Sequence, residues 1–427
     1  MRLFYNLFGV IMLPNLKATD IIEKYINEFS EEFKSKKMTK IDSVEFLKLS
    51  KNLIAELTSK EIDMLVKTDD GTYTLKSEDT DELMHSRVGA LTEGIEKFAI
   101  PSKVEIREDC DCNILDLCSG MGYNAMACLS KNKNCKIDMV EISKETLFLS
   151  LCLDIPLKEH EIIKKAYFEF FKNNIFENTD NKDNEDNENN KYINNIRVFN
   201  EDARIILQKM PDNYYNIVCH DAFSPARDPV LYTVEFLELL YKKLKDGGMI
   251  ISYSSSIPFR SALFEIGYNV YEGVSIGRKR GITIAFKGKP IYHHISIQET
   301  CGNENTCNNN ENNENNKKNT DNYENDNYEL QRISDVDERL IALSSIGIPY
   351  YDETLSKNSE EIINKREIMR EKFKDKLMVN KDDEYNYLYS TKRIKSGKID
   401  EKLLNIQKNS KNSVECINLL KKELTNL

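Results

Sequence analysis

Several features that mark other protein classes are missing from this chain of 427 residues. Its ten cysteines include no CxxC pair, so we expect no zinc site and no other bound metal. No apolar run reaches the roughly 20 residues of a membrane-spanning helix. The apolar segment 3–13 also lacks the small-residue cleavage site of a secretory signal, and Met12 is a candidate start that would remove most of it. Cysteines in apolar segments are typical of reduced, cytosolic proteins, and we predict a cytoplasmic protein without a membrane partner.

A basic surplus is missing as well, because the net charge is −11 at pH 7. Part of this charge comes from two Asn-rich tracts, 172–195 and 302–328. Their composition cannot bury enough apolar surface to offset the entropy of ordering, which predicts a disordered insertion and a disordered linker. Since the total charge is not evenly spread, a local basic patch can still bind phosphate groups.

The remaining sequence divides into three parts. Apolar residues at three- and four-residue spacing over 18–63 predict helices, which belong to an N-terminal extension of residues 1–66. The central part is 67–290, and it begins with a turn signal that predicts a hairpin over 67–75. Residues 330–427 are highly charged and mostly helical in pattern, so we expect a helical C-terminal extension.

Short apolar runs alternate with helical stretches through the central part. This alternation is typical of βαβ units and a parallel sheet. It predicts an α/β fold with a Rossmann-like, doubly wound sheet of seven strands that ends in an antiparallel hairpin. The expected strands are 113–117, 136–141, 196–199, 217–220, 249–253, 270–275 and 282–286.

A glycine turn follows the first of these strands. Gly120 and Gly122 let the backbone turn tightly beside a ligand, and the helix that follows presents free N–H groups. A dinucleotide fingerprint fits loosely, because its first glycine falls on Cys118 or on Gly120 depending on the alignment. Asp116 suits S-adenosylmethionine better, since a carboxylate at this place can bind the ammonium of the cofactor's amino-acid part.

Acidic residues also end the next two strands. Glu141 lies 19 residues beyond Gly122, where a carboxylate accepts hydrogen bonds from both ribose hydroxyls. Asp202 follows the third strand, where an Asp reads the adenine amino group, although capping of the next helix is the alternative interpretation. Together with Asp116, these carboxylates predict a class I fold that binds S-adenosylmethionine.

The fourth strand leads into Asp221-Ala222-Phe223-Ser224-Pro225-Ala226-Arg227-Asp228-Pro229. With Leu231-Tyr232-Thr233 and Ile276-Gly277-Arg278-Lys279-Arg280, this run resembles the methyltransferase domain of the MnmC family. The likeness covers roughly 67–288. It includes His85 and Glu93, in a segment that lines the cofactor and substrate pocket in that family.

The resemblance implies an S-adenosylmethionine-dependent N-methyltransferase that modifies tRNA. Family members methylate the 5-aminomethyl group of a 2-thiouridine at the wobble position of the anticodon. In bacteria this domain is often fused to a flavin-dependent oxidase, but a second glycine-rich fingerprint is absent here. We therefore expect a stand-alone methyltransferase without FAD.

The chemistry also follows from the residue types. An alkyl amine with a pKa of about 10.4 is mostly protonated at neutral pH and must lose a proton before it attacks a methyl group. Asp221 can accept that proton, while Phe223 and Pro225 shape a dry pocket. The alternative is that Asp221 only caps the turn. His220 should point to the opposite face and serve packing rather than catalysis.

Basic residues near the same edge are candidates for tRNA binding. Arg227, Lys279 and Arg280 could hold anticodon phosphates, and His85 could contact the substrate. The alternative is a solvated charge cluster.

Two other functions fit the same fold. A small-molecule amine methyltransferase or polyamine aminopropyltransferase would have several carboxylates around a long cationic substrate, whereas this edge combines one Asp with basic residues. A cofactor-binding accessory protein without catalysis is disfavoured by the intact Asp221 and both glycines of the turn.

Overall fold

A computed structural model gives the fold of the chain. It describes residues 16–76, 83–107, 112–177, 193–275, 280–290, 330–381, 384–387 and 389–425.

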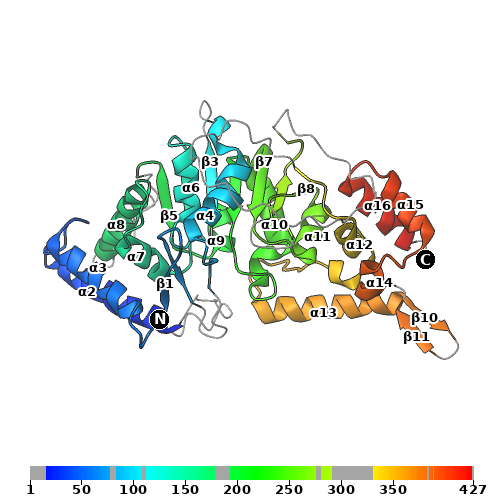
Figure 1. Ribbon diagram of the computed structural model, residues 1–427, viewed down its shortest axis with the longest axis horizontal. Coiled ribbons are helices and arrows are strands. Elements are labelled where there is room, and N and C mark those ends of the chain that lie inside the picture. Colours follow the sequence, from blue (N-terminus) through cyan, green and yellow to red (C-terminus); the bar gives the residue numbers. More distant parts are fainter. Residues whose placement is uncertain are drawn as a thin grey trace, which may run out of the picture.

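A seven-stranded sheet forms the centre of the molecule (Figure 1). Its strand order is β5-β4-β3-β6-β7-β9-β8, and all neighbouring strands are parallel except β7–β9 and β9–β8. The order reverses between β3 and β6, so the carboxyl ends of these two strands flank the crevice in which doubly wound folds bind ligands. The predicted α/β fold is confirmed. The strands are β3 (Asn113–Leu117), β4 (Lys136–Val140), β5 (Ile196–Phe199), β6 (Tyr215–His220), β7 (Leu244–Ser252), β8 (Asn269–Glu272) and β9 (Thr283–Phe286).

Apolar cores cover both faces of the sheet, because successive side chains of a strand point to opposite sides. Ile114 belongs to one core and Leu115 to the other. The first core is closed by α6 (Tyr123–Lys131), α7 (Lys144–Cys152) and α8 (His160–Glu177), and the second by α9 (Ala203–Lys209), α10 (Val234–Lys243) and α11 (Ile257–Ile266).

The N-terminal extension packs on the first core. Its helices α2 (Leu16–Lys34) and α3 (Val44–Leu57) contact α7, and an aromatic cluster joins Phe29 to Phe46, Phe148 and Phe168. The predicted hairpin follows as β1 (Leu65–Lys67) and β2 (Tyr73–Leu75), with Lys67 opposite Tyr73.

The C-terminal extension packs on the second core, and two backbone bridges join it to the central part, one at the N-cap of α10 and one at strand β8. Single β-bridges join Thr233 to Tyr350 and Glu272 to Gln331. Besides its helices, the extension contains an antiparallel hairpin, whereas the sequence pattern predicted helices alone. Its elements are α12 (Asp335–Leu343), η5 (Ser345–Gly347), α13 (Ser359–Lys376), β10 (Met378–Lys381), β11 (Glu384–Tyr387), α14 (Thr391–Lys395), α15 (Glu401–Asn409) and α16 (Ser413–Thr425).

The Asn-rich tracts are only partly covered by the structure. Helix α8 continues to Glu177, so the first six residues of the expected insertion 172–195 are helical. The rest of this insertion up to residue 192, and the whole of 302–328, lie outside the described residues. Within the described part of the chain, no helix combines the length and the apolar character needed to cross a membrane.

Candidate active site

The turn after β3 is a sharp loop with three left-handed residues. Cys118, Gly120 and Gly122 have φ angles of 57°, 53° and 83°. A Cβ at Gly122 would lie 3.1 Å from Cγ2 of Ile163 and 3.2 Å from Cε of Met139, so both the backbone angle and the tight space favour glycine there. At Gly120 nothing comes closer than 3.7 Å, which leaves that side of the loop open to a ligand.

Asp116, in β3 just before this turn, is a buried carboxylate. The residue has no exposed surface, and neither oxygen accepts a hydrogen bond of ordinary length from the described residues. Burial raises the pKa of Asp116 well above its usual range and the nearby charge of Asp221 raises it further, although the Asn124 side chain and the Ala125 N–H oppose this shift. A buried acid without hydrogen bonds is costly, which points to a ligand that supplies the missing donor.

Glu141 follows β4 and braces the same turn. Its Oε2 accepts the N–H of Gly120 at 2.9 Å, and its Oε1 accepts the N–H of Ser143 at 2.8 Å. Burial raises the pKa of Glu141, although these N–H groups counteract it. The carboxylate thus lies beside the turn, where the sequence analysis expected it to accept the ribose hydroxyls.

Asp221, directly after β6, joins this group through a residue that the sequence analysis missed. The amide Nδ2 of Asn124, in the first turn of α6, donates to Oδ2 of Asp221 at 2.9 Å. Burial raises the pKa of Asp221, while His85 and the Asn124 amide lower it. Asn124 is buried and lies 97 positions from Asp221, so only the fold shows that it orients this carboxylate.

The hairpin β1–β2 and the residues around His85, which precede the sheet in sequence, pack against the start of α6 beside the site. The hydroxyl of Tyr123 donates to the carbonyl of Tyr73 at 2.7 Å and accepts the Tyr73 N–H at 3.1 Å, which fixes the hairpin against α6. The ring of His85 packs edge-on against Tyr123, and its Nδ1 lies 3.3 Å from Oγ1 of Thr74. Burial lowers the pKa of His85, although Asp221 and Glu93 counteract this.

Glu93, in α4 (Ala90–Gly94), forms a buried ion pair that the sequence analysis also missed. Its Oε2 lies 3.1 Å from Nζ of Lys97, and its Oε1 accepts the N–H of Ser86 at 3.2 Å. Burial alone would raise the pKa of Glu93, but Ser86 and Lys97 outweigh it and lower the pKa. Lys97 lies in the π-helical segment η1 (Ile95–Ala99), and such segments occur often at functional sites.

Two residues named in the sequence analysis have other partners. Asp202 caps α9 by accepting the N–H of Arg204 at 2.8 Å, and it also pairs with the Arg204 guanidinium. Arg280 donates to Asp337 of α12 at 2.6 Å, so a phosphate contact by Arg280 would compete with this ion pair. Capping of α9, the alternative interpretation of Asp202, is thus present; adenine binding stays a prediction.

The remaining predicted residues are Phe223, Pro225, Arg227, Lys279 and His220. Phe223, Pro225 and Arg227 lie in the loop after β6, and Lys279 lies outside the described residues. His220 is buried against Phe259 and Leu231, as predicted, and burial lowers its pKa to about 4.

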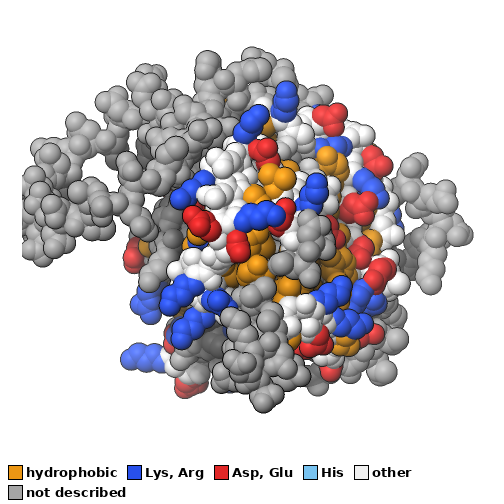
Figure 2. Space-filling view, turned by 90° about the vertical axis from the view of Figure 1, so that its right-hand side faces the viewer, with side chains coloured by type: hydrophobic (Ala, Val, Ile, Leu, Met, Phe, Trp, Pro, Cys, Tyr) orange, Lys and Arg blue, Asp and Glu red, His pale blue; other side chains and the backbone are white. Residues whose placement is uncertain are grey.

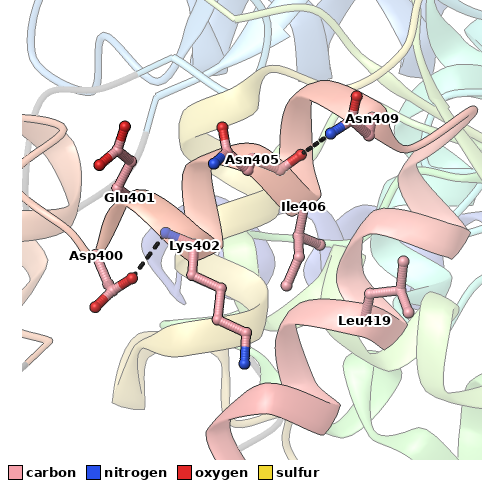
Figure 3. Close-up of a pocket in the computed structure, with 7 residues that line it drawn as sticks. All are labelled: Asp400, Glu401, Lys402, Asn405, Ile406, Asn409 and Leu419. Atoms are coloured by element: carbon pink, nitrogen blue, oxygen red, sulfur yellow. Dashed lines mark hydrogen bonds between the residues drawn. The ribbon is translucent and has the colours of Figure 1, made fainter.

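A surface hollow of about 730 Å³ lies between α15 and α16 (Figure 3). These two helices are distant in sequence from the active-site residues. Its lining includes no residue of the sheet or of the turn after β3, and the side chains in it do not form a catalytic group. It is lined by Asp400, Glu401, Lys402, Asn405, Ile406, Asn409 and Leu419.

Comparison with known proteins places this geometry in a family. A family model described as S-adenosyl-L-methionine-dependent methyltransferase matches residues 158–288. Over 407 residues, the chain is 47% identical to MJ0670 of Methanocaldococcus jannaschii, an uncharacterized protein, and the match covers 95% of each. The chain belongs to the same family as MJ0670. It is an S-adenosylmethionine-dependent methyltransferase.

The solved structures that the chain matches include the following two. The methyltransferase chain is 24% identical to MnmC2 from Aquifex aeolicus, with 82% of this chain and 99% of that chain covered and a TM-score of 0.47. For spermidine synthase from Thermotoga maritima the identity is 14%, the coverage 54% and 75%, and the TM-score 0.32.

The residues around the turn fit S-adenosylmethionine. The two buried oxygens of Asp116 lack donors, which the ammonium of the cofactor can provide. Glu141 offers carboxylate oxygens beside the turn for hydroxyl groups, and the open side of Gly120 allows close approach of a ligand to the backbone. When bound, the cofactor supplies an electrophilic methyl group.

Proposed function

We propose that this methyltransferase methylates the 5-aminomethyl group of a uridine or 2-thiouridine at the tRNA wobble position. The observation that carries the proposal is the Asp221 carboxylate, which lies at the carboxyl end of β6 and is oriented by Asn124. The resemblance of 67–288 to MnmC methyltransferase domains supports the choice of substrate.

The two carboxylate oxygens of Asp221 have different roles: one is held by Asn124, and the other can accept a proton from the substrate. Asn124 donates to Oδ2, and no hydrogen bond from the described residues occupies Oδ1. Oδ1 can therefore bind the substrate ammonium and accept its proton, which leaves the nitrogen lone pair free to attack the methyl group. Burial raises the pKa of Asp221 and so makes the carboxylate a stronger base than an exposed Asp.

His85 favours the same step through its charge state. Because burial lowers its pKa, the ring is neutral near pH 7 and does not repel the substrate ammonium. The charges of Glu93 and Lys97 cancel each other in their ion pair. The net negative charge in this part of the site therefore comes from the other carboxylates, including Asp221.

The test uses the purified protein, methyl-labelled S-adenosylmethionine and tRNA carrying 5-aminomethyl-2-thiouridine, with the nucleosides analysed by mass spectrometry. We expect the methylaminomethyl nucleoside with the wild type and with Asp246→Asn, a matched change at a side chain that is 94% exposed. Asp221→Asn should lower kcat by about 10²- to 10⁴-fold, the usual contribution of a general base, with unchanged cofactor affinity.

Two results would contradict the proposal. Methylation of free polyamines or other small amines, with no product on tRNA, would assign a small-molecule substrate. A kcat for Asp221→Asn equal to that of Asp246→Asn would remove the proton-accepting role of Asp221.

A further inference from the structure

A group of exposed basic residues surrounds the short helix α14. Lys392, Arg393, Lys395 and Lys398 are all exposed, and the stretch 389–399 contains no acidic residue. Figure 2 faces this end of the molecule and shows Lys and Arg side chains at its lower left and lower right, with Asp and Glu side chains among them and further Lys and Arg side chains above. We call these four residues the α14 basic cluster.

The protein holds this cluster in a fixed position. Ile394, in the middle of α14, is completely buried in the second core, and Ser390 caps the helix by accepting the N–H of Arg393 at 3.3 Å. Among the described residues, none of the four basic side chains forms an ion pair. Three of the four, Lys392, Arg393 and Lys395, lie in the last turn of α14, where the helix dipole favours cations, and Lys398 follows the helix.

The cluster is connected to the active-site edge by α13. Just before α13, the carbonyl of Lys357 accepts a hydrogen bond from Nη1 of Arg204. Arg204 also forms an ion pair with Asp202, which follows the carboxyl end of β5. Helix α13 also contacts η4 (Pro229–Tyr232), which follows the Asp221 loop. In Figure 1, α13 runs from there along the lower edge of the molecule toward α14.

The length of this connection suits a nucleic acid. The 18 residues of α13 span about 27 Å at 1.5 Å per residue. The hairpin β10–β11 then returns the chain to the end of α13, since Met378 pairs with Tyr387 only three residues before Ser390. The α14 basic cluster therefore lies a few tens of ångströms from the Asp221 loop, a distance that a base-paired stem spans and a free nucleoside or polyamine does not.

We propose that the α14 basic cluster binds backbone phosphates of the tRNA whose wobble nucleotide lies at Asp221. This inference rests on the proposed function for the identity of the RNA. Phosphate contacts by Lys and Arg position an RNA without reading its sequence, so the cluster contributes affinity for the substrate and no chemistry.

The test replaces all four residues by alanine and measures binding of bulk tRNA at several salt concentrations. Each lost phosphate contact lowers the slope of log K against log salt by about 0.7–0.9, so we expect a reduction of roughly 3 and at least a tenfold loss of affinity at 0.1 M salt. The matched control replaces four exposed lysines of the N-terminal extension by alanine: Lys40, Lys48, Lys51 and Lys60.

Kinetics separate this inference from the proposed function. With aminomethyl-bearing tRNA, the α14 variant should show a raised KM and an unchanged kcat. Binding and KM equal to those of the control would overturn the inference, even if the enzyme methylates tRNA. Loss of tRNA affinity in the α14 variant, with no methylation of tRNA by the wild type, would support the RNA-binding surface and contradict the proposed function.

Discussion

Asp116 and Asp337 are both completely buried, but their surroundings are opposite. Asp337 accepts hydrogen bonds from Arg280 at 2.6 Å and from Arg260 at 2.9 Å, and it thereby ties α12 to the closing hairpin of the sheet. Asp116 lies in β3 just before the turn, and neither of its oxygens accepts a hydrogen bond of ordinary length from the described residues, although the Asn124 side chain and the Ala125 N–H lie near enough to lower its pKa.

This difference separates a structural carboxylate from a binding carboxylate. A buried charge with two guanidinium partners holds two parts of the fold together, and removing it leaves a buried cation behind. A buried acid without donors destabilises the free protein, and a ligand with an ammonium group removes that cost. Substitutions at the two positions should therefore change stability in opposite directions.

Asp337→Ala should have the largest effect on stability. The change leaves the fully buried Arg260 with only Glu272 as a carboxylate partner, at 3.3 Å. We expect the free energy of unfolding to fall by about 3–5 kcal/mol, as is usual when one member of a buried ion pair is removed, and urea denaturation measures this. Asp335→Ala, at an exposed position in the same helix, should change it by less than about 0.5 kcal/mol. Equal effects of the two changes would contradict a structural role for Asp337.

Asp116→Asn should stabilise the free protein at neutral pH. The amide has nearly the same shape but does not carry a buried negative charge beside Asp221, so we expect a gain of about 1–3 kcal/mol. Urea denaturation without cofactor measures the change. A loss of stability would mean that Asp116 has partners in the free protein.

Asp228→Asn should remove part of the pH dependence of stability. Burial raises the pKa of Asp228 from 3.8 to about 6, although Arg204 opposes this shift. The folded protein therefore holds this proton more tightly than the unfolded chain, and the stability it contributes is lost as pH rises from about 4 to about 6. The difference in unfolding free energy between wild type and variant should change by about 2 kcal/mol across this window. The same difference at pH 4 and pH 7 would contradict the shift.

Cys118→Gly should have the smallest effect. Cys118 has a left-handed backbone with φ of 57°, which is unfavourable for a residue with a Cβ. Glycine relieves this strain but adds entropy to the unfolded chain, and we expect a net stabilisation of about 0.5–1 kcal/mol in thermal or urea unfolding. Clear destabilisation would show that the thiol makes contacts that outweigh the strain.

Much of the fold could be predicted from the sequence, because its signals are local. Buried parallel strands are visible in the sequence as short apolar runs. The antiparallel hairpin β1–β2 was visible because a turn at Gly71 separates its two short strands. The glycine turn and the acids at the ends of β3 and β4 were visible for the same reason.

Long-range partners were not predictable in this way. Asn124 meets Asp221 across 97 residues, and Arg280 meets Asp337 across 57. Lys97 looks like a surface residue in the sequence and is buried by the packing of a π-helical segment. The hairpin β10–β11 was missed because its strands have only four residues each and lie in a highly charged region with a mostly helical pattern, although Glu384–Tyr387 alternates polar and aromatic residues.

The most direct test of the account is calorimetric titration of S-adenosylmethionine into the wild type, Asp116→Asn and Asp337→Asn. We predict that Asp116→Asn raises Kd at least tenfold, because an ammonium bound by a buried carboxylate is worth about 1.5–3 kcal/mol, while folded Asp337→Asn binds like the wild type. Equal Kd values for the wild type and Asp116→Asn would contradict the claim that the unpartnered carboxylate at the end of β3 marks the cofactor site.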